Sequence, residues 1–213
     1  MLRSLLLTML CLALLSPTAN GATACVPSWA MSTTPTTIWL VGSSRGVPDA
    51  RHGQFKVVVR DLANNPLNGA SVVIDLSYCP DLAICADQMD PDAMVNCAAK
   101  TIRKFTNAQG EATFTVLGHS TGAADATTLA GGARIYANGT LIGQPTAAAF
   151  DLDGSGGVGA GDLSVWLADF GSGEPFGRSD FDGSASVGAA DLSDWLDAFG
   201  SGESAQSCAT SCP

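Results

Sequence analysis

The chain has 213 residues and a formal net charge of −10 at pH 7. All of this excess lies after residue 150, because residues 1–150 carry nine acidic and nine basic side chains, whereas residues 151–213 carry eleven acidic side chains and one Arg. Such an acidic chain is repelled by phosphate backbones, which excludes nucleic acid as a partner. Regularly placed Leu, Trp and Phe in the acidic part argue against simple disorder and favour a segment that holds cations.

Residues 1–24 are expected to be a removable secretory signal peptide. A basic start precedes an apolar run over residues 5–15, Pro17 ends the run, and small residues at 22–24 form the cleavage site. The run is too short to span a bilayer, and no other stretch approaches 18 apolar residues, so no membrane span is expected. The protein is therefore predicted to be secreted, either extracellular or at the cell surface.

An even number of cysteines remains after the predicted cleavage, and in an exported chain this favours disulfides. Zinc is the weaker alternative, because the spacings fit no ordinary zinc pattern and histidine is scarce. The short spacing favours a local bridge between Cys208 and Cys212, the alternative being that one of them reaches Cys25. The six positions are Cys25, Cys79, Cys85, Cys97, Cys208 and Cys212.

Residues 25–149 are predicted to form a β-sandwich, because short apolar strands alternate with turn signals and helical periodicity is absent. One expected hairpin joins residues 101–106 to residues 111–118, and another spans residues 134–143 around a type I′ turn at Asn138-Gly139. Alternation within three strands predicts inward side chains at Phe55, Val57 and Val59, at Val72, Ile74 and Leu76, and at Ala112, Phe114 and Val116.

Two stretches of this part, "VVVRDLANNPLNGASVVIDL" and "FTNAQGEATFTVLG", resemble bacterial immunoglobulin-like (Ig-like) domains of the invasin type. The resemblance runs from Gln54 to Leu117 and implies a spacer or adhesive module without catalysis. The sequence departs from that family by an insertion at 78–97 that contains three cysteines. The insertion is expected to be a loop stiffened by at least one bridge, the alternative being a ligand-binding loop on a rigid scaffold.

The acidic part contains one motif written twice. "DLDGSGGVGAGDLSVWLADFG" begins at Asp151, and "DFDGSASVGAADLSDWLDAFG" begins at Asp180. Each copy has oxygen-bearing side chains at positions 1, 3, 5 and 12, and position 7 would give a backbone carbonyl, which is the EF-hand scheme for Ca²⁺. The predicted calcium ligands are Asp151, Asp153, Ser155, Gly157 and Asp162 in the first loop, and Asp180, Asp182, Ser184, Ser186 and Asp191 in the second.

The twelfth residue of each loop is also expected to begin a short helix, because Asp at a helix start accepts backbone N–H groups and suits the macrodipole. Nine-residue helices are too short to be stable alone. Their apolar stripes are therefore expected to cover each other, about a pseudo-twofold axis, or to cover a partner. The stripes consist of Leu163, Trp166, Leu167 and Phe170 in one helix, and of Leu192, Trp195, Leu196 and Phe199 in the other.

Tandem loop–helix units with Asp at position 12 resemble dockerin repeats, and the resemblance covers residues 151–203. It implies two Ca²⁺ sites and a cohesin-like protein partner, which would meet the face around Trp166 and Trp195; the alternative is that both Trp form the core of the module. With three carboxylates each, the sites are expected to be weak, on the order of 10⁻⁴ to 10⁻³ M. The first loop is expected to be the better site, because Gly156 provides the sharp turn where the second loop has Ala185.

The expected fold class is mixed and multidomain: an all-β Ig-like sandwich followed by a small α-helical dockerin-like module of two calcium loop–helix units. The expected divisions are a signal peptide at 1–24, the sandwich at 25–149, the calcium module at 150–203 and a Cys-containing tail at 204–213. No catalytic signature is present, since His52 and His119 lie beside no nucleophile motif.

The predicted function is a secreted, non-catalytic protein whose Ig-like domain is assembled or displayed through the calcium-dependent module. Two alternatives stay open. One is an accessory carbohydrate-binding or hydrolytic component of extracellular polysaccharide degradation, with Trp29 and Trp39 as the candidate sugar contacts. The other is a structural or adhesive surface protein stiffened by calcium.

Overall fold

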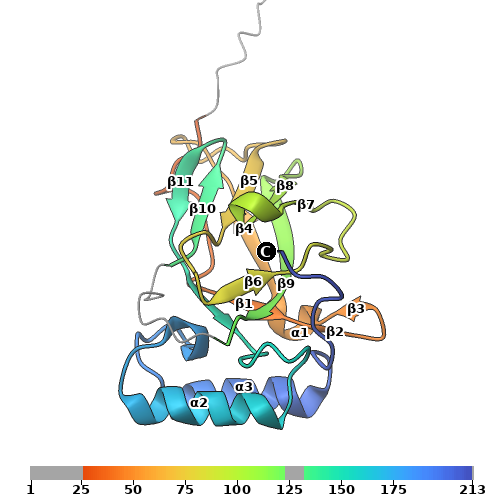
Figure 1. Cartoon of the computed structure of the whole chain (residues 1–213). Helices are drawn as coiled ribbons and strands as arrows, with labels where there is room; N and C mark the ends of the chain where they lie inside the picture. Colours follow the sequence, from red (N-terminus) through yellow and green to blue (C-terminus); the bar gives the residue numbers. More distant parts are fainter. Residues whose placement is uncertain (1–25, 123–131, 213) are drawn as a thin grey trace, which may run out of the picture.

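The computed structural model describes residues 26–122 and 132–212, so the predicted signal peptide and Cys25 lie outside the described residues. Most of the described chain forms two five-stranded sheets (Figure 1). The first has the order β12-β1-β9-β4 with β6 paired to β9, and the second has the order β11-β10-β5-β8-β7. The strands of the first sheet are β1 Thr37–Val41, β4 Gln54–Val58, β6 Leu82–Ile84, β9 Glu111–Ser120 and β12 Thr146–Ala149. Those of the second are β5 Ser71–Asp75, β7 Met94–Asn96, β8 Thr101–Phe105, β10 Arg134–Ala137 and β11 Thr140–Gly143.

Smaller elements complete the described chain. A two-stranded ribbon is formed by β2 Ser43–Ser44 and β3 Val47–Pro48, and it leads into the short helix α1 Ala50–Gly53. Two 3₁₀ turns, η1 Cys97–Ala99 and η2 Gly177–Ser179, precede β8 and the second acidic loop. The two longer helices are α2 Ala160–Ser172 and α3 Ala189–Ser201.

The two large sheets share one apolar core, and strand alternation supplies it. Val57 and Val59 are buried, Phe55 stacks on Phe114 at 5.6 Å between ring centroids, and Ile74 is fully buried. The remaining predicted inward side chains, Val72, Leu76, Ala112 and Val116, are buried as well. The inward faces expected from alternation are thus confirmed.

One predicted hairpin is confirmed and the other is wrong. β10 and β11 pair antiparallel, and Asn138 and Gly139 both have positive φ, 45° and 81°, as a type I′ turn requires. By contrast, β8 pairs with β5 and β7, whereas β9 pairs with β4, β1 and β6 in the other sheet. Ile102 of β8 and Phe114 of β9 therefore enter the core from opposite sides. Residues 107–110 connect one sheet to the other. The hairpin could not be told from such a connection by sequence, because the apolar and polar residues alternate in the same way in both cases.

The predicted fold class is wrong, because the helices do not form a separate dockerin-like α-helical module of two loop–helix units. The described structure is mainly β, with 33% strand, 20% helix and three α-helices. Both α2 and α3 lie at one end of the sheets (Figure 1). Their buried apolar residues, Trp166, Trp195 and Ala198, belong to a cluster that also contains Val41 of β1, Leu117 of β9 and Ala148 of β12. Helices of this length need such cover, and the sheets provide it.

Only part of each predicted apolar stripe faces inward. Trp166 and Trp195 are buried, at 2% and 1% exposure. Trp195 Nε1 donates a hydrogen bond to the Phe150 carbonyl at 3.1 Å, immediately after β12. α2 also turns Asp169 inward, which forms a buried bidentate ion pair with Arg178 of η2. The outward members of the two stripes are Leu167 and Phe170 in α2, and Leu196 and Phe199 in α3.

The segment after α3, blue in Figure 1, returns from the helices along the sheets. It carries two disulfides, Cys85–Cys208 and Cys97–Cys212. The predicted local Cys208–Cys212 bridge is therefore wrong. Between these cysteines, Ser211 pairs with Cys85 as an isolated β-bridge. Cys208 and Cys212 thus each bond to a different cysteine of the insertion. The insertion is crosslinked to the C-terminal segment and has no disulfide within itself among the described residues.

Two further features bear on the environment of the protein. Cys79 is buried and free of any disulfide. None of the helices in the described ranges combines the length and the apolar character that crossing a membrane requires.

Candidate metal sites

The first acidic loop brings three carboxylates together. Carboxylate oxygens of Asp151, Asp153 and Asp162 lie within 4.8 Å of one another. Asp162 is fully buried and Asp151 is 4% exposed. Asp151 Oδ2 accepts a hydrogen bond from the Gly156 N–H at 3.2 Å, but Asp151 Oδ1 is buried without a hydrogen-bond partner among the described residues. The loop therefore holds a buried acceptor that its own atoms leave unpaired.

The second loop repeats this arrangement. Carboxylate oxygens of Asp180, Asp182 and Asp191 also lie within 4.8 Å of one another, and Asp180 and Asp191 are each 1% exposed. Asp180 accepts hydrogen bonds from the Ser184 and Ala185 N–H groups, both at 2.9 Å. Both oxygens of Asp180 are thus engaged, which distinguishes it from Asp151.

The closing Asp of each loop is fixed by the backbone around it. Asp162 Oδ1 accepts from the Leu152 and Asp153 N–H groups at 2.6 and 2.9 Å, and its Oδ2 accepts from Gly159 N–H at 2.6 Å. Asp191 is held in the same way by the N–H groups of Phe181, Asp182 and Gly188. Each of these residues occupies the third position of its helix, and so joins the loop to α2 or α3.

The crowded carboxylates have perturbed acidities. Burial, together with the neighbouring charges of Asp151 and Asp153, raises the pKa of Asp162 to about 6. Burial, together with the charge of Asp191, raises the pKa of Asp180 to about 6. A cation bound among the three carboxylates of the first loop would favour the charged form of Asp162, and a cation in the second loop would favour the charged form of Asp180.

The other predicted ligands lie at the rims of the loops. Ser155 is exposed, and its N–H donates to Asp153 Oδ1 at 2.8 Å. In the second loop the Ser184 hydroxyl donates to the Ser186 carbonyl at 3.2 Å. Gly157 takes a positive φ of 152°. The structure thus gathers the three aspartates of each loop directly, with the residues at positions 5 and 7 around them.

A third acidic cluster, not predicted from the sequence, lies where α1 meets α3. It comprises Asp49, His52 and Glu203. His52 Nδ1 lies 2.7 Å from Asp49 Oδ2, and His52 Nε2 lies 3.1 Å from Asp197 Oδ2. The Ser204 hydroxyl donates to Asp49 Oδ2 at 2.7 Å. Asp49, His52, Asp197 and Ser204 are thus joined by hydrogen bonds, and the cluster is a polar junction between elements. Its one sequence signal is the Asp–x–x–His spacing at the start of α1.

Of the two readings of Trp166 and Trp195, partner contact or core, their burial supports the core. Trp166 and Trp195 are core residues, and each stacks on the Phe four residues later at 5.2 Å between ring centroids. The neighbouring side chains are exposed at the same positions of both copies. They are Leu167 (54%), Phe170 (51%), Leu196 (48%) and Phe199 (45%). We call these four residues the helix face. Helical periodicity alone places these four residues in the same stripes as the buried Trp residues.

Compared with known proteins, the chain matches no family model, no curated protein and no solved structure.

Proposed function

We propose that each acidic loop binds one Ca²⁺ ion. The observation that carries the proposal is the buried Asp151 Oδ1, which has no hydrogen-bond partner among the described residues and stands beside the carboxylates of Asp153 and Asp162. An unpaired buried acceptor is costly, and a cation offsets that cost. The candidate ligand atoms are all oxygens, which suits a hard ion such as Ca²⁺ rather than a metal that prefers sulfur or nitrogen.

We also propose that the protein acts outside the cell as a non-catalytic interaction protein. Two disulfides are typical of an oxidising compartment. Calcium would hold the loops from which α2 and α3 begin, and so support the orientation of the helix face. Four large apolar side chains exposed at matching positions are typical of a protein–protein contact. By the resemblance of residues 151–203 to dockerin repeats, the proposed partner is a cohesin-like protein.

Calorimetric titration of the full chain with Ca²⁺ tests the first proposal. We expect two weak sites, with dissociation constants on the order of 10⁻⁴ to 10⁻³ M. Asp153→Ala should remove one site and Asp182→Ala the other, because each deletes one carboxylate that makes few internal hydrogen bonds. Asp162→Ala and Asp191→Ala should have the same effects and also weaken the helix starts. Absence of binding heat at millimolar Ca²⁺ in a folded chain would refute the proposal.

Affinity capture tests the interaction. The folded protein should retain a partner from the native extracellular fraction in Ca²⁺ and release it on chelation. A Phe170→Ser/Phe199→Ser variant should fail to capture that partner while its two calcium sites remain measurable. Exposed Leu62, which lies far from α2 and α3 in sequence, offers a matched control as Leu62→Ser. Equal capture by the Phe variant and the control would place the contact elsewhere.

One observation favours a second candidate, carbohydrate binding. Trp29 is 74% exposed and borders a shallow cavity of about 280 Å³ with Leu141 and Gln144. Trp39 is engaged instead, since its Nε1 donates to the Phe181 carbonyl at 2.7 Å and its ring meets Phe150. A soluble polysaccharide that binds should change the fluorescence of the wild type but not that of Trp29→Phe. Identical responses from both proteins would remove this candidate.

A further inference from the structure

Residues 204–207, which we call the strap, connect α3 to Cys208 and run against the first acidic loop. The Val158 N–H donates to the Ser204 carbonyl at 3.0 Å, and the Ser207 N–H donates to the Gly156 carbonyl at 2.8 Å. These two bonds flank Gly157, whose carbonyl is the predicted ligand at position 7. The backbone of the first loop is therefore held from outside by a later segment of the chain.

The packing at Gly157 shows how closely the strap approaches. A Cβ atom at this position would collide with the Ala205 carbonyl oxygen, and φ is +152°, where L side chains are rarely found. The equivalent residue of the second loop is Ser186, which carries an exposed side chain. The two copies thus differ at position 7 for a physical reason. The strap covers the first loop, and the second loop has room for a side chain there.

On its other side the strap is fastened to the sheets. Ser43 and Gln206 exchange both backbone hydrogen bonds, at 2.6 and 2.9 Å. The Ser204 hydroxyl accepts from the Gly42 N–H at 3.1 Å and donates to buried Asp49. The disulfide Cys85–Cys208 follows the strap directly. The first loop is therefore joined to the β structure through one short segment.

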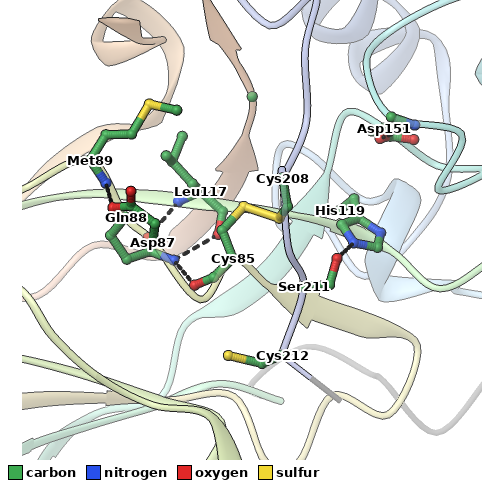
Figure 2. Close-up of a disulfide and its surroundings, with 12 residues drawn as sticks. Cys85, Asp87, Gln88, Met89, Leu117, His119, Asp151, Cys208, Ser211 and Cys212 are labelled. Atoms are coloured by element: carbon green, nitrogen blue, oxygen red, sulfur yellow. Dashed lines mark hydrogen bonds between the residues drawn. A yellow bond between two sulfur atoms is a disulfide. The ribbon is translucent and has the colours of Figure 1, made fainter. Parts of the chain in front are cut away.

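The Cys85 end of this disulfide is held by hydrogen bonds, as Figure 2 shows. The Gln88 carboxamide donates to the carbonyls of Cys85 and Leu117 at 2.7 and 3.0 Å, and it accepts from the Leu117 N–H at 2.7 Å. All three of these bonds are buried. Because Leu117 belongs to β9, the disulfide fixes the end of the strap to the central part of the first sheet.

We propose that the Cys85–Cys208 disulfide sets the calcium affinity of the first loop and leaves that of the second unchanged. The inference rests on the proposed calcium binding. With the disulfide closed, the strap is already ordered, and the first loop binds without a further loss of conformational entropy. With the disulfide open, part of the binding free energy is spent in ordering strap and loop together. By linkage, calcium makes this disulfide harder to reduce by the same factor.

The chemical step is an ordinary thiol–disulfide exchange with a dithiol reductant. Two electrons and two protons pass from the dithiol to the S–S bond. Cys85 and Cys208 become thiols, and the dithiol closes to its cyclic disulfide. Opening this bond releases the strap at Cys208, whereas the second disulfide still holds the chain four residues further on at Cys212.

The test uses the full chain with calcium as the probe. Asp182→Ala leaves the first loop as the measurable site, and Asp153→Ala leaves the second. In each background, calorimetry compares the intact protein with the Cys85→Ser/Cys208→Ser variant. We expect the dissociation constant of the first loop to rise about tenfold, within the range of coupled sites, and that of the second to change less than about twofold. Cys97→Ser/Cys212→Ser is the matched disulfide control and should affect the first loop less.

A second variant covers the case in which the cysteine variant does not fold. Gly42→Ala, in the fully oxidised protein, places a Cβ atom against the strap carbonyls of Ser204 and Gln206 without touching sulfur or the loop, and should also weaken the first loop. Gly171→Ala, at a glycine with open space around it, should leave both loops unchanged. An unchanged first-loop constant in the folded cysteine variant, or in Gly42→Ala, overturns the inference while calcium binding stands. Equal weakening of both loops overturns it too, because the effect is then general. No binding by the intact protein refutes the proposed function as well.

Discussion

At the scale of the residue, the closing aspartates carry two tasks at once. Asp162 and Asp191 each accept three backbone N–H groups, and each also contributes carboxylate oxygen to a cluster of three. The first task orders the start of a helix whether or not a cation is present. The second task brings three negatively charged carboxylates together, which is unfavourable when no cation is bound. Each loop therefore gathers negative charge that the proposed cation would offset.

The raised pKa values lead to a pH prediction. Asp162 and Asp180 have pKa values of about 6 in the folded protein, against an ordinary value of 3.8. Between about pH 4 and 6 the folded chain therefore binds more protons than the unfolded chain at these groups, so acidification through this window stabilises the calcium-free protein. In saturating Ca²⁺ the sign reverses, because protons displace the ion.

Thermal unfolding at pH 7 and pH 5, with and without Ca²⁺, checks this prediction. The calcium-free wild type should gain melting temperature on acidification relative to an Asp162→Asn/Asp180→Asn variant, which lacks both titrating carboxyls. The calcium-loaded wild type should lose melting temperature over the same interval. The same pH response in the calcium-free wild type and the variant would show that these two carboxyls do not govern it.

Residue spacing was sufficient to predict which aspartates meet. Positions 1, 3 and 12 lie on a turning loop that is closed by a helix, and that geometry is local. The need for glycine at position 157 could not be predicted in the same way, because the obstructing Ala205 carbonyl comes from a later segment. The cluster of Asp49 with His52 and Glu203 was missed for the same reason, since Glu203 arrives from beyond α3.

At the scale of the element, helical periodicity identified the amphipathic segments but not the side that is buried. Trp195 is 1% exposed and Leu196 is 48% exposed, although both belong to the stripe read from the sequence. The buried arc turns toward Ala198, which is fully buried, and away from Phe199. Where a helix packs against a sheet end rather than another helix, the shape of that end decides which residues it covers.

Substitutions at Trp195 and Leu196 test which side of α3 is buried. Trp195→Ala should lower the free energy of unfolding by about 3–5 kcal/mol, because it leaves a cavity against the sheets and deletes the hydrogen bond to Phe150. Leu196→Ala should change it by less than about 1 kcal/mol, because nearly half of that side chain already faces solvent. Denaturant unfolding of both variants measures the difference. Comparable losses would mean that the helix is rotated from the orientation described.

At the scale of the whole molecule, the acidic part and the β structure depend on each other. One apolar cluster joins Trp166 and Trp195 to strand residues, and the returning segment adds two disulfides to the insertion. The sequence pattern indicates the β part and the acidic part, and it led to the prediction of two consecutive, separate units. Composition and repeats show where the chain changes character, and they carry no signal for contacts between the two parts.

This dependence predicts the behaviour of a fragment. Residues 150–213 alone lack Val41, Leu117 and Ala148, which complete the cluster around the two Trp residues. The isolated fragment should therefore show little helix by circular dichroism, and millimolar Ca²⁺ should not restore it, whereas the full chain should bind Ca²⁺ in a folded state. A fragment that becomes fully helical on adding Ca²⁺ would prove that the acidic part folds by itself.

The long return of the chain also governs how the protein can be made. Cys208 and Cys212 lie 123 and 115 residues after their partners, so neither crosslink can close until both helices have left the ribosome. Meanwhile Cys79, Cys85 and Cys97 stand as neighbouring thiols on a nascent chain, and an early oxidant would join two of them. Correct pairing therefore requires that these three thiols stay unpaired until Cys208 and Cys212 arrive, or that early pairs are exchanged later by thiol–disulfide exchange.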